Sequence, residues 1–426
     1  MGSRLEKAKR YLVAGSFFLH VGKYLTSLRK RNRKRIDAGI GFVLRKMIYS
    51  SGKVVPNKIF VMTYDNTYSC NPRYIIEEVL RRELPVEIVW VVSPKKSLKD
   101  FPPEIKTVSR GSYTMFDEMA SSKVWIDNAL SCVWYGMPKK KGQVYINTWH
   151  GSLGIKRLSG NKFWLRRASK CNKLTDYCIA NSTFEEDVYR ETFWKDVPYL
   201  QYGHARNDVF FDKEQSDMLR EKVYEHFGLE NRPKLFLYAP TFRDDGDLSW
   251  FTIDFEALGM NLEARFGGEW VILVRMHHKD RKRRKIFSGE EWLLNASNYG
   301  DMQELLPAMD AGMTDYSSWA YDFILTKRPL FLYAPDAEKY NDGRGFYYPL
   351  ETTPFPLVAD NEELEQAILS FDEKKYLEDV DEFLKGKGCY DDGLAAKRTA
   401  DLIEKIISGE NTDLEELQSF RKNSDD

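Results

Sequence analysis

The stretch Leu235–Arg243 reads Leu-Phe-Leu-Tyr-Ala-Pro-Thr-Phe-Arg and joins a short apolar run to a polar segment. Such a run, too short for a helix, is typical of a buried strand. A second apolar run, Trp270–Val274, follows after an interval long enough for a helix, and polar residues 275–278 come directly after it. Strands that alternate with helices indicate a parallel sheet covered on both faces, which predicts an α/β fold.

The same alternation extends along most of the chain. The expected strands are Lys58–Met62, Val86–Val92, Lys123–Ile126, Val144–Asn147, Tyr177–Ala180, Leu235–Tyr238, Trp270–Val274, Trp292–Leu294, Ala311–Met313 and Leu330–Tyr333. The expected helices include Pro72–Leu84 with Asn71 as its N-cap, Met302–Met309, Ser318–Leu325, and one after Ser182, whose spacing to Glu185 is that of a capping box. The series restarts near residue 206, so we predict two successive doubly wound sheets with a cleft between them.

Length and composition fit two α/β domains. The chain has 426 residues, of which 42% are hydrophobic and 14% aromatic, enough for sizeable cores and too many for a disordered chain. Its five cysteines include no Cys-x-x-Cys pair, which argues against a disulfide framework or a zinc ribbon and favours free thiols in a reducing compartment. No run of 18 apolar residues is present, so we expect an intracellular protein without a membrane-spanning helix.

The formal net charge is zero, but the charge is unevenly distributed. Residues 1–46 contain 13 Lys and Arg against 2 Asp and Glu, a net +11, and the remaining 51 basic and 62 acidic residues give −11. Basic clusters alternate there with apolar groups at helical spacing, which is typical of an amphipathic helix on an anionic membrane. A solvated helix packed on the body is the alternative. We expect no nucleic-acid partner, because the rest of the chain is acidic and carries no reading motif.

Polar segments follow four of the predicted strands directly. They are Asn147–Gly151, Tyr238–Asp245, Arg275–His278 and Thr314–Ser318. Because ligands of doubly wound sheets bind beyond the carboxyl ends of the strands, these segments are expected to converge on a ligand-binding cleft.

Histidines are concentrated in these segments. Three of the six in the chain lie here, namely His150, His277 and His278. A histidine can take a proton from an attacking hydroxyl because its pKa lies near neutrality. A metal site at His277 and His278 is not expected, because adjacent strand residues point to opposite faces and no His-Glu-x-x-His spacing is present. A structural role is the alternative for each histidine.

Candidate anion-binding groups accompany the histidines. Arg243 and Arg275 can grip phosphate oxygens. Ser317 and Ser318 would place hydroxyls and backbone N–H groups at the start of a helix, although simple N-capping is the alternative. The P-loop and Gly-x-Gly-x-x-Gly patterns are absent, which disfavours ATPase and dinucleotide-binding functions. Phosphoryl transfer needs mainly positioning and charge stabilisation of this kind.

In order and spacing, these segments resemble the motifs of the CDP-glycerol glycerophosphotransferases, the teichoic acid primases and polymerases of Gram-positive cell walls, with relatives in capsule synthesis. The resemblance runs from about residue 58 to 395 and rests on Thr148–Gly151, Gly203 with Arg206–Asp208, Tyr238–Asp244, Arg275–His277, Thr314–Ser318, and Glu338–Tyr340 with Arg344–Tyr347. It implies a GT-B-like fold of two Rossmann-type domains. The implied division is a basic amphipathic membrane arm at 1–48, an acceptor domain at 49–205, a CDP-donor domain at 206–395, and a C-terminal helix and polar tail at 396–426.

The resemblance also implies an activity. A polyol phosphate, with glycerol phosphate as the first choice, would pass from a CDP-alcohol to a hydroxyl of a lipid-linked cell-wall or capsule glycan, releasing CMP. The implied partners are CDP-glycerol or CDP-ribitol, a polyprenyl-diphosphate-linked glycan acceptor, and an anionic surface at the cytoplasmic face of the membrane. No cofactor is implied, and a Mg²⁺ requirement is left open.

The functional residues of the family map onto this sequence by position. His150 matches the proposed base, and His277 matches the second histidine near the donor pyrophosphate, so both are expected to be catalytic. The expected donor-binding residues are Thr241, Arg243, Arg275, Asp315, Ser317, Ser318, Glu338 and Arg344, and Trp149, Gly151 and Arg206 are expected on the acceptor side. This sequence has Phe242 where many members have Trp, and Gly154–Arg157 where many have a Pro-Leu-Lys run.

Two other functions stay open on the sequence alone. A GT-B glycosyltransferase or a nucleotide-sugar epimerase would use the same cleft for another nucleotide donor. A membrane-surface scaffold with a degenerate cleft would bind no donor. The sequence does not separate glycerol from ribitol donors, or primase from polymerase from single-branch transfer.

Overall fold

The computed structural model describes residues 43, 45–50, 52–94, 97–154, 156–158, 162–243, 249–277, 290–410, 412 and 417. The predicted basic arm, residues 1–48, lies almost entirely outside the described residues, and so does His278. Among the described residues, no helix has both the length and the apolar character that crossing a membrane requires.

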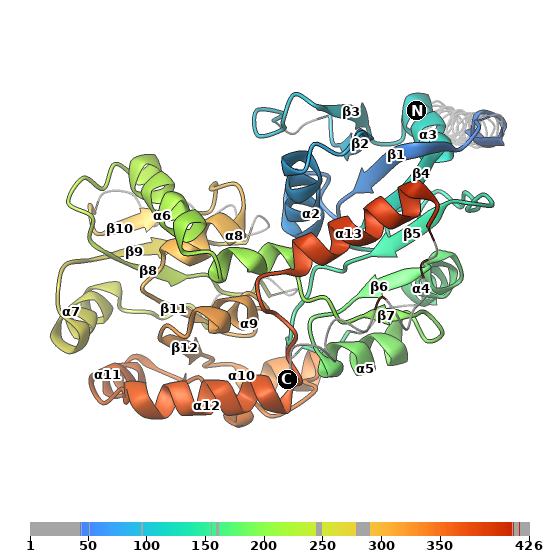
Figure 1. The fold of residues 1–426 in the computed structure, drawn as a ribbon. Coiled ribbons are helices and arrows are strands. Elements are labelled where there is room, and N and C mark those ends of the chain that lie inside the picture. Colours follow the sequence, from blue (N-terminus) through green and yellow to red (C-terminus); the bar gives the residue numbers. More distant parts are fainter. Residues whose placement is uncertain are drawn as a thin grey trace, which may run out of the picture.

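A seven-stranded parallel sheet organises the N-terminal half (Figure 1). Its strand order is β3-β2-β1-β4-β5-β6-β7, so the winding reverses between β1 and β4. The strands are β1 Val55–Met62, β2 Glu87–Val92, β3 Ile105–Ser109, β4 Ser122–Asp127, β5 Val144–Asn147, β6 Tyr177–Ile179 and β7 Tyr199–Leu200. Phe60 and Met62 of β1 join one buried core and Ile59 and Val61 the other, as expected for a sheet with helices on both faces.

A six-stranded parallel sheet organises the second half with the same winding. Its order is β10-β9-β8-β11-β12-β13, which reverses between β8 and β11. The strands are β8 Lys234–Tyr238, β9 Trp270–Val274, β10 Leu293–Asn295, β11 Ala311–Thr314, β12 Leu330–Tyr333 and β13 Leu357–Val358. In doubly wound sheets the reversal opens a crevice at the carboxyl ends of the strands, where ligands bind.

The predicted α/β, GT-B-like fold of two Rossmann-type domains is confirmed, and all ten predicted strands are present. Three strands were missed. Strand β3 has only two apolar residues, Ile105 and Val108, whose separation of three positions does not match the period of a strand. Strands β7 and β13 have only two residues each, which is too few to show any period. The five cysteines are free, as predicted.

Helices cover both sheets (Figure 1). They are α2 Cys70–Arg81, α3 Tyr113–Ser121, α4 Lys162–Leu174, α5 Thr183–Thr192, α6 Lys213–Phe227, α7 Phe255–Phe266, α8 Met302–Leu305, α9 Ala320–Phe323, α10 Ala337–Arg344, α11 Asn361–Leu369, α12 Glu373–Gly386 and α13 Ala395–Ser408. The predicted helices Met302–Met309 and Ser318–Leu325 are shorter than expected, because α8 and α9 each pass into a 3₁₀ turn.

The predicted start of α2 is wrong. The helix begins at Cys70 with Ser69 as its N-cap, so Asn71 lies inside the first turn. The buried side-chain amide of Asn71 instead donates to the Thr148 carbonyl at 3.0 Å and accepts from the backbone N–H of Arg206 at 3.2 Å. These tertiary hydrogen bonds join three separate segments and outweigh the local capping preference.

The capping box after β6 is confirmed in its first half. Ser182 Oγ accepts from the Glu185 N–H at 3.0 Å. The Glu185 carboxylate reaches back to the Asn181 N–H at 2.9 Å, one residue before the expected partner. Glu185 is therefore available to a buried polar cluster at the carboxyl edge of the sheet.

The last helix, α13, returns to the first domain and packs beside α2 (Figure 1). Ala400, Leu402 and Ile403 of α13 are buried in the same core as β1 and β2. The Asp208 carboxylate accepts from the first N–H groups of α13, at 3.0 and 2.7 Å. The chain thus crosses twice between the domains, near residue 205 and near residue 390.

We expect Gly312→Ala, in the middle of β11, to destabilise the protein by about 1–3 kcal/mol. A Cβ at Gly312 would lie 2.9 Å from Cη2 of Trp319 and 3.1 Å from Cδ1 of Leu330. The Trp319 ring cannot yield easily, because its N–H donates to the buried Ala239 carbonyl at 2.8 Å. The free energy of unfolding in urea measures the loss.

The matched control for this substitution is Gly259→Ala in α7, where a Cβ meets nothing within 4 Å. Alanine there should stabilise the helix by about 0.5–1 kcal/mol. Equal unfolding free energies for the two variants would show that β11 is not tightly packed against Trp319.

Candidate active site

A sharp turn follows β5 at the carboxyl edge of the first sheet. Trp149 has a left-handed backbone with φ of +48°, which is uncommon for a bulky residue and marks a functional or strained position. Its N–H donates to Asn147 Oδ1 at 2.9 Å, and its buried ring packs against Phe193 and Trp194. The turn places His150, the next residue, at the edge of the cleft.

The His150 imidazole is held in one orientation and one tautomer. Its Nδ1 lies 2.6 Å from the Asn128 carbonyl oxygen, which can only accept, so Nδ1 carries the proton and Nε2 keeps a lone pair. Burial lowers the pKa of His150 to about 4; the Asn128 carbonyl opposes this shift and the Arg206 charge adds to it. The ring is therefore neutral at pH 7 and able to accept a proton at Nε2.

Tyr64 and Asn128 flank His150 from the two central strands. Tyr64 follows β1, and its ring stacks on the imidazole with a centroid distance of 4.8 Å and an interplanar angle of 25°. Asn128 follows β4, and its Oδ1 accepts from the Tyr64 N–H at 2.9 Å. Asn128 thus binds the His150 ring through its backbone carbonyl and the Tyr64 backbone through its side chain.

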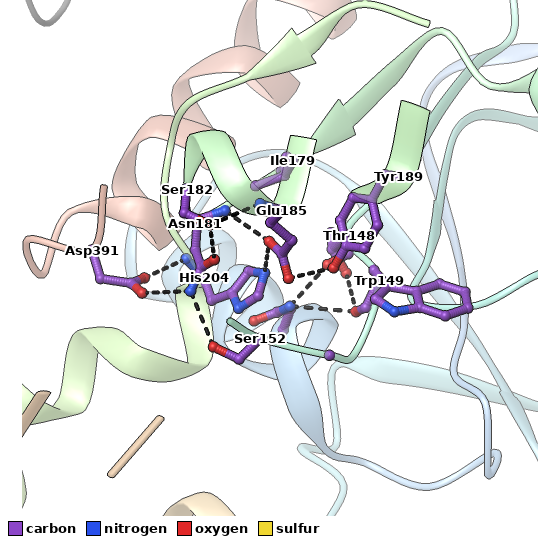
Figure 2. Close-up of polar contacts among 12 residues, drawn as sticks. Thr148, Trp149, Ser152, Ile179, Asn181, Ser182, Glu185, Tyr189, His204 and Asp391 are labelled. Carbon is purple, nitrogen blue, oxygen red and sulfur yellow. Dashed lines mark hydrogen bonds and ion pairs between the residues drawn. The ribbon is translucent and has the colours of Figure 1, made fainter. Parts of the chain in front are cut away.

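A buried polar network supports the residues next to His150 (Figure 2). Asn181 Nδ2 donates to Ser152 Oγ at 3.1 Å and to Asp391 Oδ2 at 2.9 Å. The Asp391 carboxylate also accepts from the backbone N–H of His204 at 2.7 Å. The segment that leads into α13 is therefore hydrogen-bonded to the loop that carries His150.

Glu185 completes this network (Figure 2). Its Oε2 lies 3.0 Å from His204 Nε2, and its Oε1 accepts from the Tyr189 hydroxyl. A Cβ at Gly151 would lie 3.8 Å from that hydroxyl and 3.1 Å from Trp149 Nε1, so the loop packs closely against both aromatic residues.

Arg206, predicted on the acceptor side, is buried at the junction of the two domains. Its guanidinium forms a bidentate pair with Asp322 of α9, at 3.1 Å from Nε and 2.9 Å from Nη2. Nη2 also donates to the Gly151 carbonyl at 2.5 Å. Arg206 thus joins the His150 loop to the second domain.

Arg243 lies beyond the carboxyl end of β8, between two carboxylates. Its Nε and Nη2 donate to Asp336 at 2.7 and 2.8 Å, and its Nη1 donates to Asp315 at 2.8 Å and to the Thr241 carbonyl at 2.7 Å. Trp250 also packs over the guanidinium, 4.3 Å from Cζ to the ring centroid. The bidentate side of Arg243 is occupied by a carboxylate, so in this structure Arg243 organises the strand ends.

Thr241 and the segment after β11 lie at the reversal of the second sheet. Asp315 Oδ1 accepts from the Thr241 N–H at 2.8 Å, which joins the ends of β8 and β11. The Thr241 hydroxyl is buried and, among the described residues, has no hydrogen-bond partner. Ser317 and Ser318 are partly exposed and precede α9, which has only four residues.

Arg275 and His277 follow β9. The Arg275 guanidinium donates to the carbonyls of Ala296, Tyr299 and Gly300 at 3.2, 2.7 and 3.2 Å. Its charge also acts on the Tyr64 phenol of the first domain, where it opposes the burial that raises the pKa of Tyr64. His277 stacks on Phe242 at 4.4 Å. In the part of the chain that the structure describes, no cluster of His, Cys, Asp or Glu could hold a metal ion.

The segment after α10 contacts the loop after His150. Glu338 is an exposed residue in the first turn of α10, and Arg344 is the last residue of the helix. The Arg157 N–H then donates to the Gly345 carbonyl at 3.0 Å, and Arg157 Nε donates to the Phe346 carbonyl at 2.9 Å. The Tyr348 hydroxyl donates to the Leu153 carbonyl at 2.5 Å.

The His150 loop also approaches the phosphate-binding candidates of the second domain. A Cβ at Gly154 would lie 3.3 Å from Ser318 Cβ. The loop that carries His150 on the first domain and the segment that carries Ser318 on the second domain therefore lie in contact.

Sequence reasoning missed several residues that build this site. The predicted site comprised the polar segments after β5, β8, β9 and β11, so Tyr64 and Asn128 were not among its residues, and Asn71 was predicted only as an N-cap. The signal was available, since Tyr64 and Asn128 follow the predicted strands at Lys58–Met62 and Lys123–Ile126 just as the other segments follow theirs. The partners of Arg206 and Arg243 carried no local signal.

The model of the CDP-Glycerol:Poly(glycerophosphate) glycerophosphotransferase family matches residues 46–405. The chain belongs to this family. It is similar to the teichoic acid poly(glycerol phosphate) polymerase of Staphylococcus epidermidis, with 30% identity over 400 residues, which cover 89% of this chain and 54% of that protein. The chain therefore spans about half the length of that relative. The predicted resemblance to the glycerophosphotransferase family is confirmed.

Solved structures agree with this assignment. A variant of the wall teichoic acid polymerase TagF soaked with CDPG superposes with a TM-score of 0.76 and 28% identity, covering 89% of this chain and 97% of its own. A putative UDP-N-acetylglucosamine 2-epimerase from Listeria monocytogenes gives a TM-score of 0.51 at 14% identity, over 84% of this chain and 98% of its own. The second likeness shows a shared fold alone, so the glycerophosphotransferase assignment is favoured over the epimerase alternative.

We expect the His150 ring protons to titrate with a midpoint near pH 4, well below the usual histidine value, because burial disfavours the imidazolium. The neutral base therefore persists above about pH 4, and catalysis that depends on it should be lost only as the pH falls through that value. NMR titration measures the midpoint, and the His150→Gln spectrum assigns the resonance. A midpoint at or above 6.5 would contradict the buried, neutral imidazole.

Proposed function

We propose that this glycerophosphotransferase transfers a polyol phosphate, glycerol phosphate in the first instance, from a CDP-alcohol to a hydroxyl of a lipid-linked glycan, releasing CMP. The observation that carries the proposal is the His150 imidazole, whose Nδ1 is fixed on the Asn128 carbonyl while Nε2 remains a base at the edge of the cleft. A neutral imidazole held in this way is suited to removing a proton from an attacking hydroxyl.

The reaction is a single displacement at the β-phosphorus of the donor. The acceptor hydroxyl oxygen bonds to the β-phosphorus, and the bond from that phosphorus to the oxygen bridging to the α-phosphate breaks. CMP leaves with the electron pair, and the proton of the hydroxyl passes to Nε2 of His150. Positioning of the two substrates supplies most of the catalysis.

Groups of the second domain would receive the donor. The buried Thr241 hydroxyl has no partner among the described residues and lies beside Asp315, at the reversal of the sheet. Ser317 and Ser318 add hydroxyls on the side that approaches the His150 loop. Arg243 keeps Asp315 and Asp336 in place, and His277 would act near the pyrophosphate. The match to a CDPG-soaked polymerase supports a CDP-alcohol as donor.

We expect His150→Ala to reduce acceptor-dependent CMP release by roughly 10²–10⁴-fold, because general-base catalysis contributes about that much. The measurement is CMP release from CDP-glycerol and CDP-ribitol with a lipid-linked disaccharide. His226→Ala is the matched control, since His226 is an exposed histidine on α6. Release of UDP from a nucleotide sugar, with no CMP from either CDP-alcohol, would instead identify a glycosyltransferase.

The basic residues 1–46 would hold the enzyme at the membrane, where a polyprenyl-diphosphate-linked acceptor lies. Their net +11 charge suits an anionic surface, and each basic residue near such a surface contributes about 1 kcal/mol. Deletion of residues 1–46 should therefore abolish cosedimentation with phosphatidylglycerol vesicles at physiological salt. If the truncated protein still pellets with these vesicles, another surface holds the enzyme there.

A further inference from the structure

Tyr64 occupies the switch point of the first sheet, where the winding reverses between β1 and β4. It follows the carboxyl end of β1, and Asn128, which binds its N–H, follows that of β4. Ligands of doubly wound sheets bind in this crevice.

The loop that carries Tyr64 is held rigidly by its own hydrogen bonds. Thr63 Oγ1 donates to the Thr67 carbonyl at 2.9 Å and accepts from the Thr67 N–H at 3.1 Å. The Thr67 hydroxyl donates to Asp65 Oδ2 at 2.5 Å. A ring and a carboxylate fixed in advance lose little conformational entropy when a ligand binds.

The Tyr64 ring offers a free face beside the base. One face stacks on His150, yet 53% of the residue is exposed, so the opposite face and edge are open to solvent. The negative charges of Asp65 and Asp301 add to the rise that burial causes in the pKa of Tyr64, while Arg275 opposes it. The exposed ring therefore lies within reach of charged groups from both domains.

Asp65 stands next to this ring and next to the base. Its carboxylate is close enough to His150 to oppose the burial that lowers the imidazole pKa. The side chain is only partly buried, and its oxygens retain lone pairs beyond those used by Thr67. An aromatic face with an adjacent carboxylate can bind a sugar, because the C–H face of a pyranose packs on the ring and its hydroxyls donate to the carboxylate.

We propose that Tyr64 and Asp65 form a subsite for an uncharged pyranose ring of the acceptor, with the sugar stacked on the free face of Tyr64 and a hydroxyl donating to Asp65. The proposal rests on the proposed function and names the acceptor unit that lies beside His150. A polyol phosphate chain is the poorer occupant, because the Asp65 carboxylate would repel its phosphates and its flexible backbone offers no flat apolar face.

The test compares Tyr64→Leu, Tyr64→Phe and Tyr113→Leu with the wild-type full chain. Tyr113, at the start of α3, is the matched control because 51% of it is exposed and it lies outside the site. With a short-chain, lipid-diphosphate-linked disaccharide as acceptor, Tyr64→Leu should raise the acceptor KM roughly tenfold and leave the donor KM unchanged. Tyr64→Phe and Tyr113→Leu should match the wild type.

Two further readings separate a sugar subsite from other roles. A glycerol phosphate oligomer used as acceptor should show the same KM in wild type and Tyr64→Leu. Slow release of CMP to water, without acceptor, depends on His150 and not on the sugar, so in Tyr64→Leu it should fall by a much smaller factor than transfer to the disaccharide does. If that release falls as much as transfer does, Tyr64 only positions His150 and the subsite is disproved. An unchanged KM for the disaccharide acceptor in Tyr64→Leu would disprove it as well.

Binding without turnover keeps this proposal separate from the proposed function. Saturation-transfer NMR with the same disaccharide probe should show contact in the wild type, a loss in Tyr64→Leu and a weakening in Asp65→Asn. If the wild type releases no CMP from CDP-alcohols yet binds the sugar through Tyr64, the donor assignment fails and the subsite stands. If the sugar binds equally well to wild type and Tyr64→Leu, the subsite fails whatever the turnover.

Discussion

The fold and the site both depend on one buried cation, the guanidinium of Arg206. Only 3% of Arg206 is exposed, and its charge is balanced by Asp322 of the second domain. A buried charge that loses its partner costs several kcal/mol, so this pair resists separation of the domains at their junction. The same guanidinium donates to the Gly151 carbonyl. Burial is the main cause of the low pKa of His150, and the positive charge of Arg206 lowers that pKa further. One side chain therefore links the two domains, anchors the loop that carries His150 and helps to keep the imidazole neutral.

Local sequence pattern was enough to predict the architecture and the edge of the sheet where the site lies. Continuous apolar runs such as Trp270–Val274 are buried on both faces, so they stand out from helices and loops, whereas the two residues of β7 show no period. The placement of His150, Thr241 and Asp315 at this edge followed from their positions after predicted strands, because every strand of a parallel sheet ends at the same edge. No side-chain geometry was needed for that step.

Pairing between distant residues could not be predicted in this way. Arg243 was expected to grip phosphate, but the structure places its bidentate side on Asp336, 93 residues away in sequence. Arg206 pairs with Asp322 across 116 residues. An arginine in a sequence gives its charge but not its partner, and a carboxylate competes with phosphate for the same planar fork. For this reason the sequence indicated which residues lie in the site, but it did not show which of them are free to bind a ligand and which hold other residues in place.

The two faces of the cleft differ in charge in a way that suits two different substrates. On the second domain, Asp315 and Asp336 neutralise Arg243, and hydroxyls such as that of Thr241 remain as short-range donors to an anion. On the first domain, the imidazole is neutral, the phenol is un-ionised and Asp65 is negative. The negative charge of Asp65 disfavours a second phosphate on that side, but it leaves an uncharged hydroxyl free to approach. The same charge stabilises the imidazolium that forms when His150 takes the proton of that hydroxyl. In the proposed reaction, this asymmetry would place the anionic donor on one domain and the nucleophile on the other.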